Sequence, residues 1–150
     1  MPRRYFEDFP EGYSVELGTF SLSADDIVAF ARQYDPQPMH VDPEAARATA
    51  YGGLIASGWQ TATSFMRLLV DTVLADTASM GSPGVDSLRW LKPVRPDEVL
   101  RARFTVLESR PSNSRPEWGI VRSLGEVLNQ ADDVVMRFEG VNFLARRPPG

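Results

Sequence analysis

The sequence predicts an α+β fold in one domain of residues 1–150, in which an antiparallel sheet packs against a single long helix. The first observation is a run of apolar residues at helical spacing between Trp59 and Leu74. The second is a series of four alternating segments after Gly81, which is typical of strands. The third is that the chain contains neither an internal repeat nor an interdomain linker. Consecutive strands favour antiparallel pairing, and one long helix can cover one face of such a sheet.

The chain is expected to begin with an arm and to end with a frayed tail. Residues 1–13 combine aromatic and acidic residues with proline and glycine, so we expect an ordered arm there. Residues 146–150 are expected to form the tail. After the arm, Ser14–Leu22 alternates as a strand does, although Gly18 interrupts the pattern.

A first helix is predicted to begin after Ser23, whose side chain can cap it. Asp25 and Asp26 fall in the first turn, where the helix dipole favours negative charge. The helix should end at Asp35, because Pro36 follows and pushes its predecessor out of the helical region.

Two further helices are predicted. A short one should open at Pro43, with Asp42 as its N-cap. The long helix should begin after Ser57, because Gln60 lies three residues further on, as in a capping box. Its apolar residues are expected to belong mostly to the core, and they are Trp59, Ala62, Phe65, Met66, Leu69, Val70, Val73 and Leu74.

Four strands are predicted after this helix, and we expect them to follow one another as a meander. They are Val85–Val94, Val99–Glu108, Trp118–Leu128 and Val134–Ala145. In the second of them, alternate residues are apolar and arginines lie between them, which predicts one buried and one exposed face.

Composition and charge disfavour several classes of function. The net charge of -4 and the pI of about 5.0 argue against nucleic acid as the main partner. The chain has no cysteine, which excludes disulfides and thiol nucleophiles, and its single histidine argues against a zinc site. No apolar run approaches the roughly 18 residues of a membrane span, and no signal peptide is recognisable. We therefore expect a cytoplasmic protein without metal or membrane contact.

The segment from Tyr34 to Asp42 contains the only histidine of the chain. This histidine, His40, follows Asp35 by five residues, and two prolines stiffen the backbone between them. A carboxylate and the one side chain that titrates near neutrality are therefore held on a segment with little freedom, which suits a general acid–base pair.

Three motifs of this sequence resemble those of the MaoC-like dehydratases, relatives of the (R)-specific enoyl-CoA hydratases. The family motif is approximately Gly-Asp-x-Asn-Pro-Ile/Leu-His-x-Asp/Glu, and the matching residues are Asp35, Pro38, Met39, His40 and Asp42. Residues 55–59, Ile-Ala-Ser-Gly-Trp, match the family's small-residue turn and the glycine that opens its central helix. Residues 88–97 resemble the strand that leads into Pro-Val-x-Pro-Gly-Asp, with Asp97 kept and the glycine missing. Three positions depart from the family pattern: Tyr34 replaces a glycine, Gln37 replaces an asparagine, and Met66 stands where many hydratases have a serine. Neighbouring Thr63 and Ser64 are alternative sources of that hydroxyl.

The resemblance implies a single hotdog fold, in which the antiparallel sheet wraps around the central helix. It implies reversible hydration of an α,β-unsaturated acyl-CoA thioester by an Asp35–His40 dyad, with the backbone N–H of Gly58 as an oxyanion hole at the positive end of the helix dipole. Further contacts with the substrate are expected from Gln37, Pro38, Ser57 and Trp59. Coenzyme A enters as part of the substrate, and no cofactor is expected. The family also implies a homodimer, or a dimer of dimers, with its active sites at the interface.

Two other functions stay open at this point. A hotdog thioesterase would hydrolyse the same class of substrate, but the histidine motif and the lack of a carboxylate on the central helix before Asp71 disfavour it. A non-catalytic acyl-CoA-binding domain is the second alternative, and the three departures from the family pattern keep it open. The sequence leaves undecided the acyl chain length, the physiological direction and which member of the dyad takes the first proton.

Overall fold

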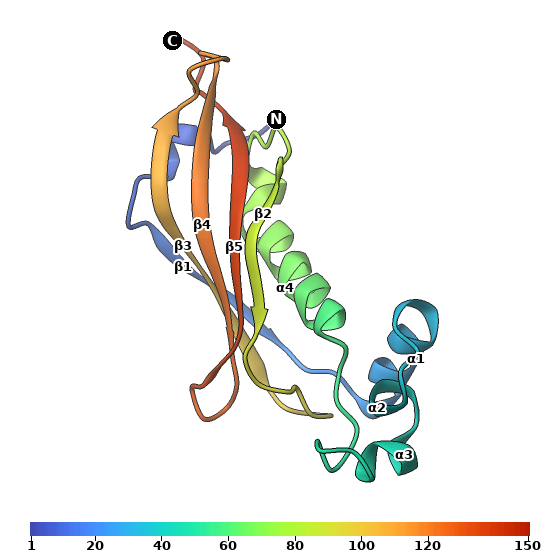
Figure 1. Ribbon diagram of the computed structural model, residues 1–150. Coiled ribbons are helices and arrows are strands. Elements are labelled where there is room, and N and C mark those ends of the chain that lie inside the picture. Colours follow the sequence, from blue (N-terminus) through green and yellow to red (C-terminus); the bar gives the residue numbers. More distant parts are fainter.

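A computed structural model describes all 150 residues, and its five strands form one antiparallel sheet in the order β1-β3-β4-β5-β2 (Figure 1). The strands are β1 (Ser14–Phe20), β2 (Gly84–Trp90), β3 (Leu100–Pro111), β4 (Trp118–Leu128) and β5 (Val134–Ala145). The helices are η1 (Phe6–Asp8), α1 (Ala24–Tyr34), α2 (Pro38–Val41), α3 (Pro43–Arg47), α4 (Gly58–Thr72) and η2 (Leu74–Asp76). The predicted α+β class and the hotdog arrangement of sheet and central helix are confirmed.

The predicted meander is correct for β3, β4 and β5 and wrong for β2. Strand β2 pairs with β5, at the edge of the sheet opposite β1, so the chain must cross the end of the sheet to reach β3. The crossing segment, residues 91–99, includes Asp97, which adopts a left-handed backbone conformation with φ of 64° and donates its N–H to the carbonyl of Leu22 at 2.7 Å. Alternation along a strand carries no information about its neighbours, which is why the sequence did not predict this pairing.

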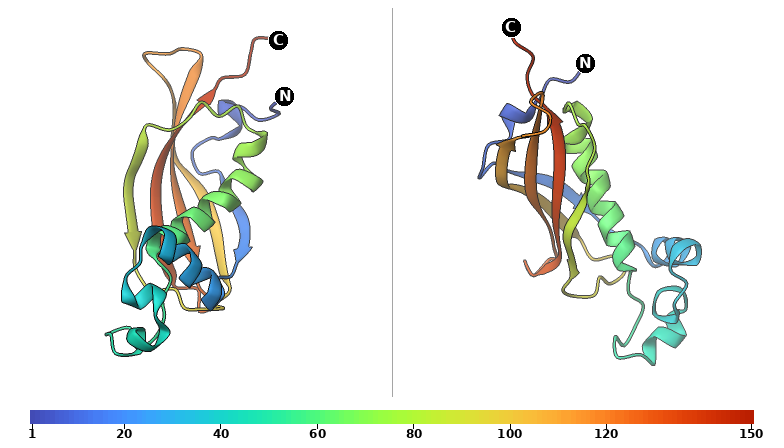
Figure 2. Two further views of the ribbon diagram at one scale, coloured as in Figure 1. Left: turned by 90° about the vertical axis from the view of Figure 1, so that its right-hand side faces the viewer. Right: turned by 45° about the horizontal axis from the view of Figure 1, so that its top comes forward.

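Helix α4 runs diagonally across one face of the sheet, and short helices α1, α2 and α3 lie beyond one end of the sheet (Figure 2). The buried side chains of α4 include Phe65 and Leu69, which pack against the apolar face of β3. Gly125 of β4 allows this approach, because a Cβ at that position would lie 2.2 Å from the Phe65 ring.

The apolar stripe predicted for α4 is only partly in the core. Ala62, Phe65, Leu69 and Val73 are buried, but Trp59, Met66 and Val70 are 56%, 37% and 37% exposed. Met66 lines a small cavity together with residues of β2, and Trp59 contacts Trp90 at the end of that strand. The exposed apolar residues therefore extend the apolar face of α4 towards the edge of the sheet.

Local capping signals account for the short helices. Ser23 and Asp26 form a reciprocal capping box at the start of α1, with both hydrogen bonds at 3.0 Å. Asp42 caps α3 as predicted. The capping box predicted for α4 is wrong: Ser57 accepts only from the N–H of Trp59, and the Gln60 side chain turns away to donate to the carbonyl of Asp26.

The N-terminal arm and the residues after β5 contact each other. Phe6 and Phe9 of the arm are buried. Arg147 donates its backbone N–H to Glu7 at 2.7 Å and its guanidinium to Asp8 at 2.6 Å, so the predicted frayed tail is anchored through residue 147. None of the helices combines the length and the apolarity needed to cross a membrane.

Candidate active site

The candidate site forms where α1 ends, α2 begins and the extended segment before α4 returns to the sheet (Figure 1). Asp35 is the C-cap of α1, and the proline after it forces the chain out of the helix. Pro38 then opens the four-residue helix α2, which the sequence did not predict. His40 is thus held by the helical backbone of α2, four residues after Pro36 has ended the first helix.

The orientation of the His40 ring is fixed by a backbone carbonyl. The side chain is buried, and Nδ1 lies 2.8 Å from the carbonyl oxygen of Ile55. Because a carbonyl oxygen can only accept, Nδ1 must carry the hydrogen. In the neutral ring Nε2 therefore has a free lone pair, and this atom faces Oδ2 of Asp35 at 3.4 Å.

Two side chains stabilise the carboxylate of Asp35. Gln37 donates its amide to Oδ1 at 2.6 Å, and Ser57 donates its hydroxyl to Oδ2 at 2.7 Å. The hydrogen bond from Gln37, followed by that from Ser57, holds the pKa of Asp35 below its ordinary value; partial burial acts in the opposite direction and His40 adds a smaller lowering. Asp35 is consequently ionised at neutral pH.

Ser57 and Gly58 connect the dyad to the start of α4. Ser57 is fully buried, and its oxygen bridges Asp35 and the N–H of Trp59, which lies at 3.3 Å. The N–H of Gly58, the first residue of α4, has no acceptor within the chain. It lies at the positive end of the helix dipole, so it can donate to an oxygen that carries negative charge.

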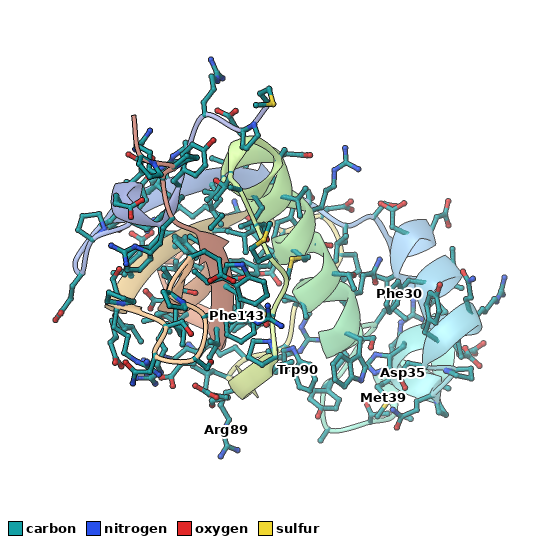
Figure 3. All side chains as sticks on the ribbon, turned by 90° about the horizontal axis from the view of Figure 1, so that it is seen from above. Phe30, Asp35, Met39, Arg89, Trp90 and Phe143 are labelled. Carbon is teal, nitrogen blue, oxygen red and sulfur yellow. The ribbon has the colours of Figure 1, made fainter.

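A cavity of about 290 Å³ adjoins these groups, and of them His40 and Gly58 line it. Its other walls come from residues between 51 and 61, from Val135 of β5, from Trp90 at the end of β2 and from residues 91–94 that follow it. Figure 3 shows Asp35 and Trp90 beside the same end of α4, while Arg89 points away from it. Sequence reasoning missed Trp90 as a site residue, because its place in the cavity depends on the pairing of β2 with β5.

The remaining predicted substrate contacts lie at the margin of this arrangement. Gln37 and Pro38 are exposed, and the amide of Gln37 is directed at Asp35. Trp59 meets the Trp90 ring edge-on at 5.1 Å and borders a separate open pocket with Phe30, Tyr34 and Thr63. The structure therefore connects Asp35 to Gln37, Ser57 and His40 by direct contacts, and Gly58 follows Ser57 in the chain. Of the predicted site residues, only His40 and Gly58 line the cavity.

No group of three or more histidine, cysteine, aspartate or glutamate side chains is close enough to hold a metal ion. The groups at the site are the imidazole of His40, the carboxylate of Asp35 and the backbone N–H of Gly58. These three can bind a water molecule and polarise a carbonyl group.

Comparison with known proteins shows the family to which this chain belongs. The family model of the MaoC-like domain matches residues 10–122. The Bacillus subtilis protein YdeM, which is uncharacterised, is 34% identical over 134 residues, covering 89% of this chain and 92% of its own length. A 3-hydroxybutyryl-CoA dehydratase of Methylorubrum extorquens is 27% identical over 154 residues, covering 91% and 93%. An (R)-specific enoyl-CoA hydratase of Rhodospirillum rubrum is 34% identical over 107 residues, covering 68% and 69%.

A solved structure has the same fold. The crystal structure of a MaoC-like dehydratase from Rhodospirillum rubrum superimposes with a TM-score of 0.88 at 39% sequence identity. The match covers 97% of this chain and 99% of that one.

Proposed function

This chain belongs to the MaoC-like dehydratase family, and from that premise we propose that it adds water reversibly to an α,β-unsaturated acyl-CoA thioester. The observation that carries the proposal is the cavity lined by His40 and Gly58, where ionised Asp35 faces Nε2 of His40 and the N–H of Gly58 has no acceptor within the chain. The names of two relatives, a 3-hydroxybutyryl-CoA dehydratase and an (R)-specific enoyl-CoA hydratase, support the same substrate class.

In the proposed reaction, one water molecule in the cavity bridges Nε2 of His40 and the carboxylate of Asp35 and donates a hydrogen bond to each. Nε2 of His40 takes a proton from this water as its oxygen forms a bond to the β carbon. The electron pair of the double bond moves towards the thioester, whose oxygen becomes negatively charged. Asp35 stabilises the imidazolium that results, and the same proton is then delivered to the α carbon, which restores the carbonyl group.

Gly58 would hold the thioester oxygen during this step. Its N–H is fixed by the start of α4 and needs no rearrangement to meet the developing charge. A preorganised donor of this kind contributes on the order of 2.7–4 kcal/mol to stabilisation of the transition state. No cofactor takes part, and coenzyme A is present only as the thiol portion of the thioester substrate.

We further propose that the protein acts as a homodimer. Strand β2 is an edge strand, so one side of its backbone is unpaired. Exposed apolar side chains surround this edge, namely Met66 and Val70 on α4 and Val85 and Trp90 on β2. Because Trp90 also lines the cavity, a second copy docked at this edge would border the active site. A cytoplasmic location fits an acyl-CoA substrate.

A substrate panel tests the proposed function against its alternatives. Enoyl-CoA and 3-hydroxyacyl-CoA thioesters of varied chain length and branching are incubated with the protein, and enoyl absorbance, free thiol and binding heat are recorded. Loss of enoyl absorbance without thiol release is the expected result. Thiol release would identify a thioesterase, and binding without any turnover would identify a non-catalytic acyl-CoA-binding protein; either result overturns the proposal.

A further inference from the structure

Trp90 lies against the same helix end that carries the free N–H of Gly58. It is the last residue of β2, and its side chain is on the α4 face of the sheet. A Cβ on Gly58 would lie 2.3 Å from Cε2 and 2.7 Å from Nε1 of the indole, so only glycine lets the ring approach this closely. Both residues line the cavity that contains His40.

The indole N–H of Trp90 is a donor without a partner. The hydrogen bonds around the cavity are made by His40, Ser57 and Lys92, and none of them reaches Trp90. An indole nitrogen can only donate, so it can satisfy an oxygen of a bound molecule but not a proton donor.

The two donors are close enough to share one oxygen atom. Within any residue, backbone N and Cβ are about 2.5 Å apart. Since Nε1 is 2.7 Å from the ideal Cβ position of Gly58, it lies within about 5 Å of the Gly58 nitrogen. Two N–H groups that each bind one oxygen at about 2.9 Å can be up to about 5.8 Å apart.

Contacts on two sides position Trp90, as a donor to a transition state requires. Next to it, the N–H of Leu91 donates to the carbonyl of Val135 at 2.8 Å, and Lys92 forms an ion pair with Asp133 at 2.8 Å. The Trp59 ring packs edge-on against the indole. The tryptophan therefore has contacts with α4 on one side and a backbone anchor to β5 on the other.

We propose that the indole N–H of Trp90 is a second catalytic donor to the thioester oxygen, beside the N–H of Gly58. This inference rests on the proposed hydratase function and adds a side-chain donor to its oxyanion hole. The oxygen gains charge as the water adds to the β carbon, and two fixed donors stabilise that charge more than one does.

The Trp90→Phe variant tests the donor while keeping an aromatic ring over Gly58. With crotonyl-CoA, we expect kcat to fall on the order of 10²-fold, because a transition-state donor is lost, and KM to stay within about threefold. Trp118→Phe is the matched control, since Trp118 stacks on Phe143 at the far end of β4 and β5, and it should leave kcat unchanged. A Trp90→Phe enzyme with kcat within about twofold of the wild type would overturn the inference and leave the hydratase proposal standing.

A measurement on the wild-type protein keeps the inference testable if the variant fails to fold. The chain has three tryptophans, so its indole N–H signals can be assigned by NMR with Trp59→Phe and Trp118→Phe. Butyryl-CoA, which has the carbonyl but no double bond, should move the Trp90 proton downfield, and free coenzyme A should not. A Trp90 signal that responds equally to both ligands, or to neither, would overturn the inference.

The same data separate failure of the inference from failure of the proposed function. A wild-type protein that shifts the Trp90 signal with butyryl-CoA but hydrates no enoyl-CoA would refute the hydratase proposal and support the donor. A protein that neither binds nor turns over these thioesters would overturn both.

Discussion

At the scale of single residues, two hydrogen bonds determine the charge state of Asp35. Gln37 and Ser57 each donate to a different carboxylate oxygen, which leaves His40 as the neighbour that can exchange a proton. Gln37 stands where the family has asparagine, and its longer amide still reaches the carboxylate. The departure at this position therefore preserves a donor to the dyad.

Replacing Gln37 with methionine should lower the free energy of unfolding at neutral pH and change it much less at acidic pH. The Gln37 hydrogen bond is the largest influence that lowers the pKa of Asp35, so its loss raises that pKa towards the ordinary value of about 3.9. In the native protein, stability contributed by ionised Asp35 is complete above about pH 3.9 and is lost as the pH falls through the lower folded-state pKa. Urea unfolding of both proteins from neutral to acidic pH checks this, and a difference in the free energy of unfolding that stays constant with pH would contradict it.

Replacing Ser57 with alanine should reduce both stability and activity. Loss of the N-cap costs about 1 kcal/mol in the free energy of unfolding, and Asp35 loses a donor at the same time. Ser64→Ala is a suitable control, because that hydroxyl donates only to a carbonyl within the same helix. Urea unfolding and crotonyl-CoA turnover measure the two effects. Equal behaviour of the two variants would refute the role given to Ser57.

How much of the site the sequence predicted depends on the distance between its parts along the chain. Asp35 and His40 are five residues apart, and the stiff segment between them made the pair predictable. Ser57 follows Asp35 by 22 residues, and Trp90 reaches Gly58 only through the fold. Sequence reasoning therefore assigned Ser57 to the substrate, whereas its hydroxyl is directed at Asp35.

At the scale of secondary structure, the start of α4 and the end of β2 are fitted to each other. An alanine at position 58 would place its Cβ 2.3 Å from the Trp90 ring, so one of the two elements must shift. We expect Gly58→Ala to lower the free energy of unfolding by about 1–3 kcal/mol, as overpacking does. Gly53→Ala is the control, since the nearest atom to its Cβ would be 3.6 Å away.

A double-mutant cycle tests whether the contact between position 58 and the Trp90 ring causes this loss of stability. Trp90→Leu removes the ring, so Gly58→Ala should cost much less in that background than in the wild type. Urea unfolding of the four proteins supplies the free energies. Strict additivity of the two substitutions would show that the loss has another origin.

Elements governed by local signals were predicted well. The caps of α1 and α3, and the bounds of β4 and β5, agree with the structure because caps and turn residues act over a few positions. The position of β2 in the sheet and the exposure of one flank of α4 were predicted wrongly. Both depend on which distant segment of the chain packs against the element. Alternation and helical spacing carry no information about that neighbour.

At the scale of the whole molecule, the apolar edge formed by β2 and α4 is the surface expected to join two copies. Val85→Asp would place a charge at this edge, whereas Val99→Asp changes an equally exposed valine just before β3. By light scattering after gel filtration, the wild type and Val99→Asp should have twice the chain mass of 16.7 kDa, and Val85→Asp should approach the single-chain mass. A wild-type mass of one chain at every concentration would refute the dimer.

The most direct test of the account is hydration of crotonyl-CoA by the wild type, Asp35→Asn and His40→Ala, followed through the loss of enoyl absorbance. Removal of a general acid–base group lowers rates by about 10²–10⁴-fold, so we expect turnover by the wild type and losses of that size in both variants. Circular dichroism confirms that the variants are folded. Wild-type rates in both folded variants would contradict the assignment of the Asp35–His40 dyad.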